Sequence, residues 1–192
     1  RSFIIDSCTS ASSRMCSRAD LYVPSGALIL SRKRISKDRV EKRIHNAIDQ
    51  VYKYDWYLLL KDASERSIVH KLAQYLGTFF GDWDVDTEYN RNVSKANDPT
   101  PKTKKLIDTG EKPRKVFPDV IIHERGVENN FLVIEVKKSA NCKGKTDDIL
   151  KLRKLKTQIG YAYAYFLEIK TGPNWMKKPK YTLKEIKEEK VP

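Results

Sequence analysis

The chain has 192 residues, of which 40% are hydrophobic and 33% are charged, enough for one sizeable core with an appended segment. No apolar run approaches the roughly 20 residues of a membrane-spanning helix, so we expect a cytoplasmic protein with no membrane partner. The formal net charge of +13 predicts a polyanionic partner, with nucleic acid ahead of an anionic membrane surface. Three widely spaced cysteines without C-x-x-C spacing argue against a zinc site or a redox pair.

Residues 1–33 are rich in serine and show no sustained periodicity, so we interpret them as an irregular segment: a leader, a cloning remnant or a flexible arm. From Ser36 onward, apolar residues recur at helical spacing and predict an amphipathic helix, with Val40, Ile44, Ala47, Ile48 and Val51 on its buried face. The short apolar run 55–60 fits a strand or an extension of this helix. A second helix is predicted from Asp62, whose side chain can cap it, to Gly77.

The next segments predict a sheet. Residues 84–90 alternate as a strand with one wet face, and residues 91–115 form a long basic loop with three prolines. The apolar runs 117–123 and 131–137, joined by a polar stretch with Gly and Asn, predict a β-hairpin. A helix capped by Thr146 or Asp147 and a strand over 161–169 follow. Residues 34–170 thus form one domain, and residues 171–192 an exposed basic tail with a helix near its end.

The predicted hairpin concentrates charge at one place. Glu135 and Lys137 are two residues apart and therefore share a face of their strand, and an antiparallel neighbour can bring Asp119 beside them. Acids at the edge of an apolar sheet cost several kcal/mol to desolvate unless something such as a divalent cation compensates. Carboxylate oxygens suit Mg²⁺ or Mn²⁺, so we expect one of these ions as cofactor.

The order of these elements, with Pro118-Asp119 followed by Glu135-Val136-Lys137, resembles the PD-(D/E)xK phosphodiesterase superfamily, including its small bacterial and phage members. The resemblance covers roughly residues 62–170. It implies an α/β restriction-endonuclease-like core, a mixed central sheet flanked by helices, and metal-dependent hydrolysis of nucleic acid, with DNA favoured over RNA. It also implies metal ligands at Asp119, Glu135 and the carbonyl of Val136, with Glu65 as a further candidate from the preceding helix.

The chemistry explains these residue types. A phosphodiester resists attack because its anionic oxygens repel hydroxide, and Mg²⁺ held by Asp119 and Glu135 would neutralise the phosphate and lower the pKa of bound water. Lys137 would orient the attacking water or stabilise charge, with a lowered pKa if it is buried beside the metal. Basic or amide side chains nearby would bind phosphates without reading sequence. The candidates are Arg91, Lys138, Lys151, Lys154 and Gln158. A homodimer would suit cleavage of both strands of a duplex.

Several plainer interpretations stay open. Glu-x-Lys also occurs at Glu168 and Glu185, and Glu135 could simply pair with a lysine at a wet strand end. Glu65 has the spacing of a capping box with Asp62, and Glu88 fits a solvated acid as well as a phosphate-side group. The tyrosines at 161, 163 and 165 fit a packed sheet face or a base-stacking platform. For function, the alternatives are a non-catalytic nucleic-acid-binding module on the same fold and a membrane-surface protein.

Overall fold

The computed structural model describes residues 35–89, 91–92, 102–103, 105–106, 114–141 and 143–187. The predicted irregular segment 1–33 lies outside this described part, as do most of the predicted basic loop and the last five residues. The described residues form an α/β fold in which a mixed sheet is flanked by helices, and this confirms the predicted fold class.

The central sheet has five strands in the order β1 (Asp84–Thr87), β6 (Val120–Glu124), β7 (Asn129–Lys138), β8 (Tyr163–Ile169) and β9 (Tyr181–Glu185). Strands β7 and β8 are parallel, and the other neighbours are antiparallel. The predicted hairpin is therefore present as β6 and β7. Their register shifts between Ile122 and His123, near the turn and away from the acidic end of the pair.

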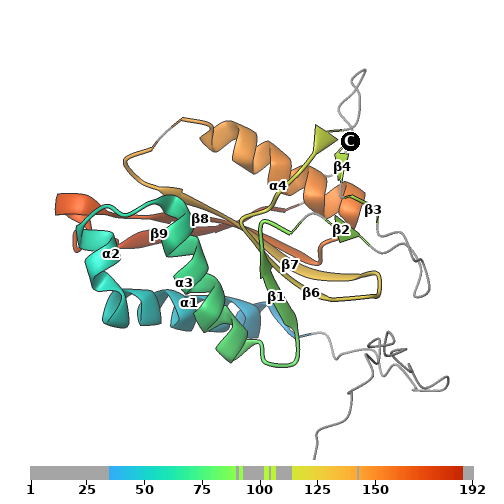
Figure 1. The fold of residues 1–192 in the computed structure, drawn as a ribbon, viewed down its shortest axis with the longest axis horizontal. Coiled ribbons are helices and arrows are strands. Elements are labelled where there is room, and N and C mark those ends of the chain that lie inside the picture. The colour runs from blue at the N-terminus through green and yellow to red at the C-terminus, as the bar shows by residue number, and fades with distance from the viewer. Residues whose placement is uncertain are drawn as a thin grey trace, which may run out of the picture. The chain divides into compact units, whose positions relative to one another are not determined.

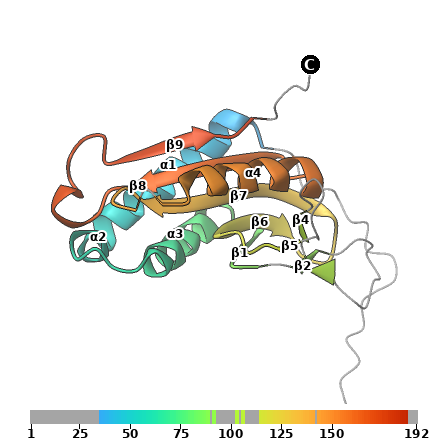
Figure 2. The same cartoon turned by 90° about the horizontal axis from the view of Figure 1, so that it is seen from above.

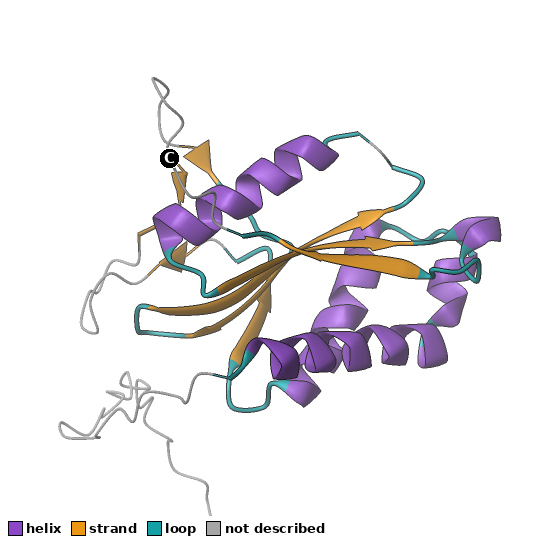
Figure 3. Cartoon of the chain, turned by 180° about the vertical axis from the view of Figure 1, so that it is seen from behind, coloured by secondary structure: helices purple, strands orange, loops and turns teal. Residues whose placement is uncertain are grey.

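Helices cover both faces of this sheet, as Figures 1 and 2 show from two directions. The helices α1 (Lys37–Tyr54) and α3 (Glu65–Phe79) lie on one face, and α4 (Lys145–Ile159), which connects the parallel strands β7 and β8, lies on the other. The view from behind shows the same three layers, with the central sheet between the helices (Figure 3). The short α2 (Trp56–Leu60) follows α1, and the 3-10 turn η1 (Gly172–Asn174) follows β8.

Alternation along β7 divides the buried side chains between two cores. Leu132, Ile134 and Val136 pack with α1 and α3, whereas Val133 packs with the buried leucines of α4. Glu135 follows the parity of Val133 and therefore faces the α4 side. The face that carries the predicted site is thus set by the two-residue period of one strand.

The first predicted helix is confirmed as α1, and all five of its predicted core residues are fully buried. Residues 56–60 are the helix α2. The predicted start of α3 is wrong: Ser64, not Asp62, caps it, with Ser64 Oγ accepting a hydrogen bond from the Ser67 N–H at 3.2 Å. Asp62 has a φ of 50° and bonds instead to Lys138 and Thr171. The helix also runs past Gly77 to Phe79.

The predicted caps of α4 are also wrong, because the helix starts at Lys145 and so places Thr146 and Asp147 inside its first turn. Gly144 precedes it with a φ of 76°, a conformation that glycine adopts without steric cost. Within the predicted basic loop, two short strand pairs occur: β2 (Arg91–Asn92) with β3 (Lys102–Thr103), and β4 (Lys105–Leu106) with β5 (Arg114–Lys115).

The predicted exposed tail is wrong over residues 171–187. Strand β9 pairs with β8 at the edge of the sheet, and Ile186 is 3% exposed in the core beneath α4. The lysines of this segment interrupt the apolar pattern by which a strand is predicted. Charged residues are nevertheless typical of edge strands, where they discourage pairing with other chains. Tyr161 and Tyr165 are core residues at most 2% exposed, Tyr161 beneath α4 and Tyr165 on the side of α1 and α3. No helix among the described residues is long and apolar enough to cross a bilayer.

Candidate metal centre

The hairpin brings Asp119 and Glu135 together. Val120 pairs with Ile134 in the antiparallel register, so the next residue outward, Asp119, lies opposite Glu135 on the same face. The backbone N–H of Val136 donates to Asp119 Oδ2 at 2.8 Å and holds the carboxylate against β7. The predicted juxtaposition is therefore correct, and it follows from the strand period and the register alone.

Glu135 is the most deeply buried acid of the described chain, with 2% of its surface exposed. Its Oε2 lies 2.6 Å from Lys151 Nζ, which reaches down from α4. Its Oε1 is buried and accepts no hydrogen bond from the described residues. An unpartnered buried polar atom costs about 1–3 kcal/mol, more for a charged group, so this oxygen marks a position where the protein by itself is incomplete.

Lys137 is held by two further acids. Its Nζ lies 3.0 Å from Asp148 Oδ2 and 3.6 Å from Glu65 Oε1. The other oxygen of Glu65 accepts from the backbone N–H of Lys138 at 3.1 Å, so Glu65 belongs to this cluster and not to a capping box. We call the whole set the acidic cluster: Glu65, Asp119, Glu135, Lys137, Asp148 and Lys151.

Asp148 is the member that sequence reasoning missed. It lies in the first turn of α4, where acids are common because they stabilise the helix dipole. Its spacing of three residues from Lys151 was the available signal, since residues i and i+3 share a helix face. Two residues of α4 therefore meet two residues of β7: Lys151 pairs with Glu135, and Asp148 pairs with Lys137.

The acidic cluster is short of positive charge. It contains four carboxylates and two ammonium groups, a formal excess of two negative charges in a chain that carries +13 overall. Burial raises the pKa of Glu135 well above its usual range, and the neighbouring Asp119 adds to this against the opposing effect of Lys151. Burial also raises the pKa of Asp119, although the N–H of Val136 and the charge of Lys151 oppose it.

We expect a lowered pKa for Lys137 beside a metal ion, whereas the chain's own residues shift this pKa in the opposite direction. Burial does lower it, but the hydrogen bond and charge of Asp148, together with the charges of Glu65 and Asp119, outweigh burial and raise the pKa. Lys137 therefore carries its proton at neutral pH.

The carboxylates of the cluster are ligands of the kind that a hard cation takes. Among the described residues, no three His, Cys, Asp or Glu side chains are gathered as in a preformed metal cage. Mg²⁺ does not require such a cage, because it commonly binds through one or two carboxylates and completes its shell with water and substrate phosphates. Asp119 and Glu135 are the candidates for that pair, and Oε1 of Glu135 accepts no hydrogen bond from the described residues.

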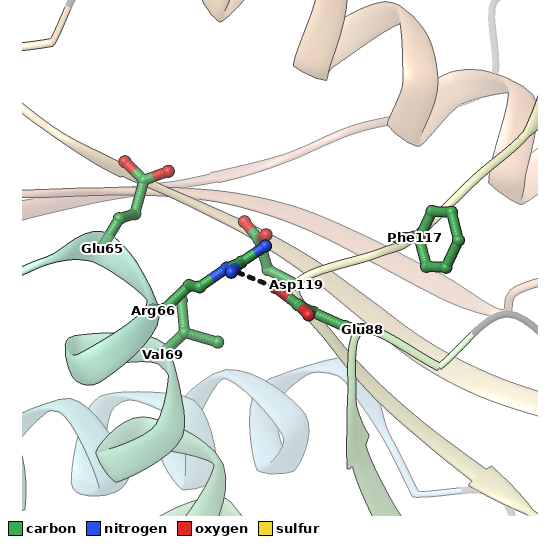
Figure 4. A pocket seen from close by; sticks show the side chains of 6 residues that line it. All are labelled: Glu65, Arg66, Val69, Glu88, Phe117 and Asp119. Atoms are coloured by element: carbon green, nitrogen blue, oxygen red, sulfur yellow. Dashed lines mark ion pairs between the residues drawn. The ribbon is translucent and has the colours of Figure 1, made fainter.

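Asp119 also faces a pocket of about 290 Å³, lined by Glu65, Arg66, Val69, Glu88, Phe117 and Asp119 (Figure 4). Across this pocket, Arg66 Nε lies 2.8 Å from Glu88 Oε1, and the backbone N–H of Glu88 donates to the Pro118 carbonyl at 3.0 Å. Glu88 is half-exposed and has a φ of 50°. The pocket gives a ligand access to the Asp119 side of the acidic cluster.

The residues predicted to bind nucleic acid fall into different environments. Lys151 lies in the cluster itself, whereas the Lys138 ammonium is held 2.8 Å from Asp62 Oδ1 and 3.2 Å from the Ala63 carbonyl. Lys154 lies one turn beyond Lys151 on α4, and Gln158 two turns beyond it, roughly 10 Å along the helix axis. Arg91 begins β2, and its side chain lies outside the described structure.

Neither protein-family models nor curated proteins match this chain. Among solved structures, a crystal structure of SSO0001 is 18% identical, with a TM-score of 0.33, over 78% of this chain and 65% of that one. The chain therefore corresponds to 65% of the length of that protein.

Proposed function

We propose that this chain is a metal-dependent nuclease with a restriction-endonuclease-like core, which hydrolyses phosphodiester bonds with Mg²⁺ or Mn²⁺ as cofactor. The observation that carries this proposal is Glu135, a buried acid opposite Asp119 with one oxygen that no described residue satisfies. A structural ion pair would have both oxygens engaged, because burying an unmatched carboxylate is costly.

Asp119 and Glu135 would hold the cation, with the Val136 carbonyl as a further ligand and Glu65 and Asp148 at its margin. When bound, Mg²⁺ would neutralise the scissile phosphate and make water more acidic. Lys137 is fixed between Asp148 and Glu65, whose charges favour its protonated form, so it would be suited to stabilising the charge of the phosphate. Lys151 lies 2.6 Å from Glu135 Oε2 and offsets part of the negative charge of the cluster.

The formal net charge of +13 supports a polyanionic substrate. Lys154, Gln158 and Arg91 remain candidates for phosphate contacts beyond the cluster. The motif resemblance favours DNA over RNA, and a homodimer would allow both strands of a duplex to be cut. None of these assignments depends on reading base sequence.

The test is cleavage of single-stranded, duplex and branched DNA and of RNA, with Mg²⁺ or Mn²⁺, by the native chain, Asp119→Asn and Glu135→Gln. These changes keep the side-chain shape and remove the charge, so we expect activity to fall by about 10²–10³-fold. Lys137→Ala should cause a comparable loss.

The chain offers a matched control for each change. Glu185, the last residue of β9, and Lys187 have the same Glu-x-Lys spacing, and Glu185 pairs with Lys37 of α1 and not with a member of the acidic cluster. Glu185→Gln and Lys187→Ala should leave activity within about threefold of native. Binding of nucleic acid without cleavage in any metal would overturn the proposal in favour of a non-catalytic binding module on the same fold.

A further inference from the structure

An exposed aromatic surface lies where α1, α2 and η1 meet. Tyr54, Trp56, Tyr57 and Met176 are each between 44% and 59% exposed. Together with Phe117 and Leu150, they make up the exposed large hydrophobic side chains of the described chain, so four of these six belong to α1, α2 or the residues beside η1. We call these four residues the aromatic surface. Clustered exposed aromatic residues are typical of a binding site, whereas single exposed ones need no explanation.

A stacked framework supports this surface from beneath. The rings of Tyr52 and Trp175 are stacked with centroids 6.3 Å apart, and Trp56 stacks on Trp175 at 6.1 Å. The Tyr52 hydroxyl donates to the Lys180 carbonyl at 2.6 Å and ties α1 to the segment before β9. The framework thus joins residues 52–56 to residues 175–180, and Tyr57 packs edge-on against Trp56 with ring centroids 5.8 Å apart.

Lysines lie directly against these rings. The Lys53 ammonium is 4.7 Å from the centre of the Tyr54 ring, Lys61 is 5.7 Å from that of Tyr57, and Lys180 is 5.2 Å from that of Tyr52. The acid within this stretch, Asp55, is turned away, since it accepts from the Tyr75 hydroxyl at 2.6 Å. Rings that can stack on bases therefore lie close to ammonium groups that can bind phosphates.

The aromatic surface is joined to the acidic cluster by a short chain of contacts. The backbone N–H of Lys138 donates to Glu65, and the Lys138 ammonium binds Asp62, at the end of the turn that follows α2. Asp62 also accepts from the Thr171 hydroxyl at 2.7 Å, and Thr171 immediately precedes η1. Figure 1 shows α2 at the same end of the sheet as the start of α3, which carries Glu65.

We propose that the aromatic surface binds unpaired nucleotides that flank the scissile phosphate, so that the substrate of this chain has a single-stranded portion. This inference rests on the proposed nuclease function and names its substrate class. Bases stacked inside a duplex have no free face, so protruding rings gain contact only with unpaired bases. The lysines beside the rings favour a polyanion over an apolar protein partner.

The experiment measures binding in EDTA, where no metal-dependent cleavage occurs, by fluorescence anisotropy. The probes are a labelled oligo-dT strand and a labelled hairpin duplex of the same number of nucleotides. The proteins are the full native chain, Tyr54→Ala/Tyr57→Ala and Tyr54→Phe/Tyr57→Phe. We expect the alanine variant to lose about fivefold or more in affinity for oligo-dT, less than twofold for the duplex, and the phenylalanine variant to bind like native.

A lysine pair controls for charge. Lys53 and Lys42 are both exposed on α1, but Lys53 lies over the Tyr54 ring. Lys53→Ala should weaken oligo-dT binding severalfold more than Lys42→Ala, because both remove one charge but only one removes an ammonium from the aromatic surface. Both tyrosines are largely exposed, and thermal melts of the variants should match native.

Three results would overturn the inference: native affinity of the alanine variant for oligo-dT, equal losses on strand and duplex, or a loss of binding to anionic lipid vesicles with none to oligo-dT. The last would assign the surface to a membrane. The cleavage test is independent of these results. If the binding results are as expected but the native chain cleaves nothing in any metal, the nuclease function is wrong and the nucleotide-binding surface stands. If Asp119→Asn abolishes cleavage but the tyrosine substitutions do not change binding, the nuclease function stands and the nucleotide-binding surface is wrong.

Discussion

Asp86 and Glu135 are both acids of the central sheet, two strands apart, and the protein treats them in opposite ways. Asp86 on β1 is held by Arg125 through Nε at 2.9 Å and through a second guanidinium nitrogen, and it lies 2.8 Å from His123 Nε2. Although burial raises the pKa of Asp86, the hydrogen bonds from Arg125 and His123 prevail and lower it. Glu135 has one ammonium partner, no described residue binds its other oxygen, and its pKa is raised.

The difference separates a structural acid from a candidate ligand. Both oxygens of Asp86 are satisfied by side chains of the same chain, so adding a cation there would displace existing partners. The carboxylates around Glu135 exceed the ammonium groups around it, so a cation would complete the charge balance. Burial alone does not distinguish the two sites; the completeness of the counter-charge does.

The largest effect on stability is expected at Asp86, whose two oxygens are bound by Arg125 and His123. Asp86→Ala should lower the free energy of unfolding by about 2 kcal/mol, since it leaves Arg125 and His123 without their shared acceptor. Urea denaturation at pH 7 measures the change. Glu168→Gln, which affects a more exposed pair, should cost less than about 1 kcal/mol. An Asp86→Ala variant as stable as native would contradict the comparison, because the contacts of Asp86 with Arg125 and His123 would then have no structural role.

The next effect concerns the acidic cluster, and it can be measured as a change in stability without an activity assay. Mg²⁺ or Mn²⁺ at ten times its dissociation constant should raise the free energy of unfolding of the native chain by about 1.4 kcal/mol, through preferential binding to the folded state. The same titration should leave Asp119→Asn and Glu135→Gln unchanged and should stabilise Glu168→Gln as it does the native chain. Thermal melts across the metal titration measure this. Equal stabilisation of all four proteins would place the cation elsewhere.

A smaller effect of opposite sign is expected for Asp119→Asn without metal. Removing this charge relieves its repulsion with Glu135, and the asparagine oxygen can still accept from the Val136 N–H. The variant should therefore be more stable than native by about 1 kcal/mol in EDTA, as is common where a functional site is not optimised for stability. Urea denaturation in EDTA measures this, and a clear loss of stability would show that Asp119 is a structural acid like Asp86.

The smallest effects are the pH dependences, which also have opposite signs. The folded pKa of Asp86 is lowered, so its stabilisation is present above the unfolded value of about 3.9 and is lost as pH falls through the folded value. The folded pKa of Asp119 is raised, so its ionisation destabilises the fold at neutral pH, and this cost disappears as pH falls.

The advantage of Asp119→Asn over native should therefore shrink, by under about 1 kcal/mol, between pH 7 and pH 4, whereas the deficit of Asp86→Ala should persist over that range. Urea denaturation at three pH values in EDTA measures both. Parallel behaviour of the two variants would mean that the acids do not differ in charge balance.

The parts of the fold that could be predicted from the sequence are those in which side chains repeat with the period of a single helix or strand. The spacing of Val40, Ile44 and Val51 defines the buried face of α1, and the two-residue period of β7 places Glu135 and Lys137 on one face. A short turn closes the β6–β7 hairpin, so the antiparallel register, and with it the meeting of Asp119 and Glu135, could be predicted as well.

Errors arose where a distant partner competes with a local preference. Asp62 has the chemistry of a helix cap, but Lys138 and Thr171, far along the chain, bind its carboxylate and Ser64 caps the helix instead. The Lys-rich segment around Tyr181 lacks the apolar run of a buried strand, yet pairing with β8 makes it the edge of the sheet. Local propensity gives way in both cases because the long-range contact satisfies more hydrogen-bonding groups.

The sequence by itself determined the identity and face of the paired acids, the hairpin that carries them, and the positive charge that favours a polyanionic partner. Only the tertiary structure decided that Lys151 pairs with one oxygen of Glu135 while no described residue binds the other, and that Asp148 holds Lys137. It also decided that Tyr52, Trp56 and Trp175 stack beside the exposed aromatic residues. The physical reason is range. Side-chain periodicity is a property of one element, whereas the counter-charge at a buried acid depends on which other elements pack against it.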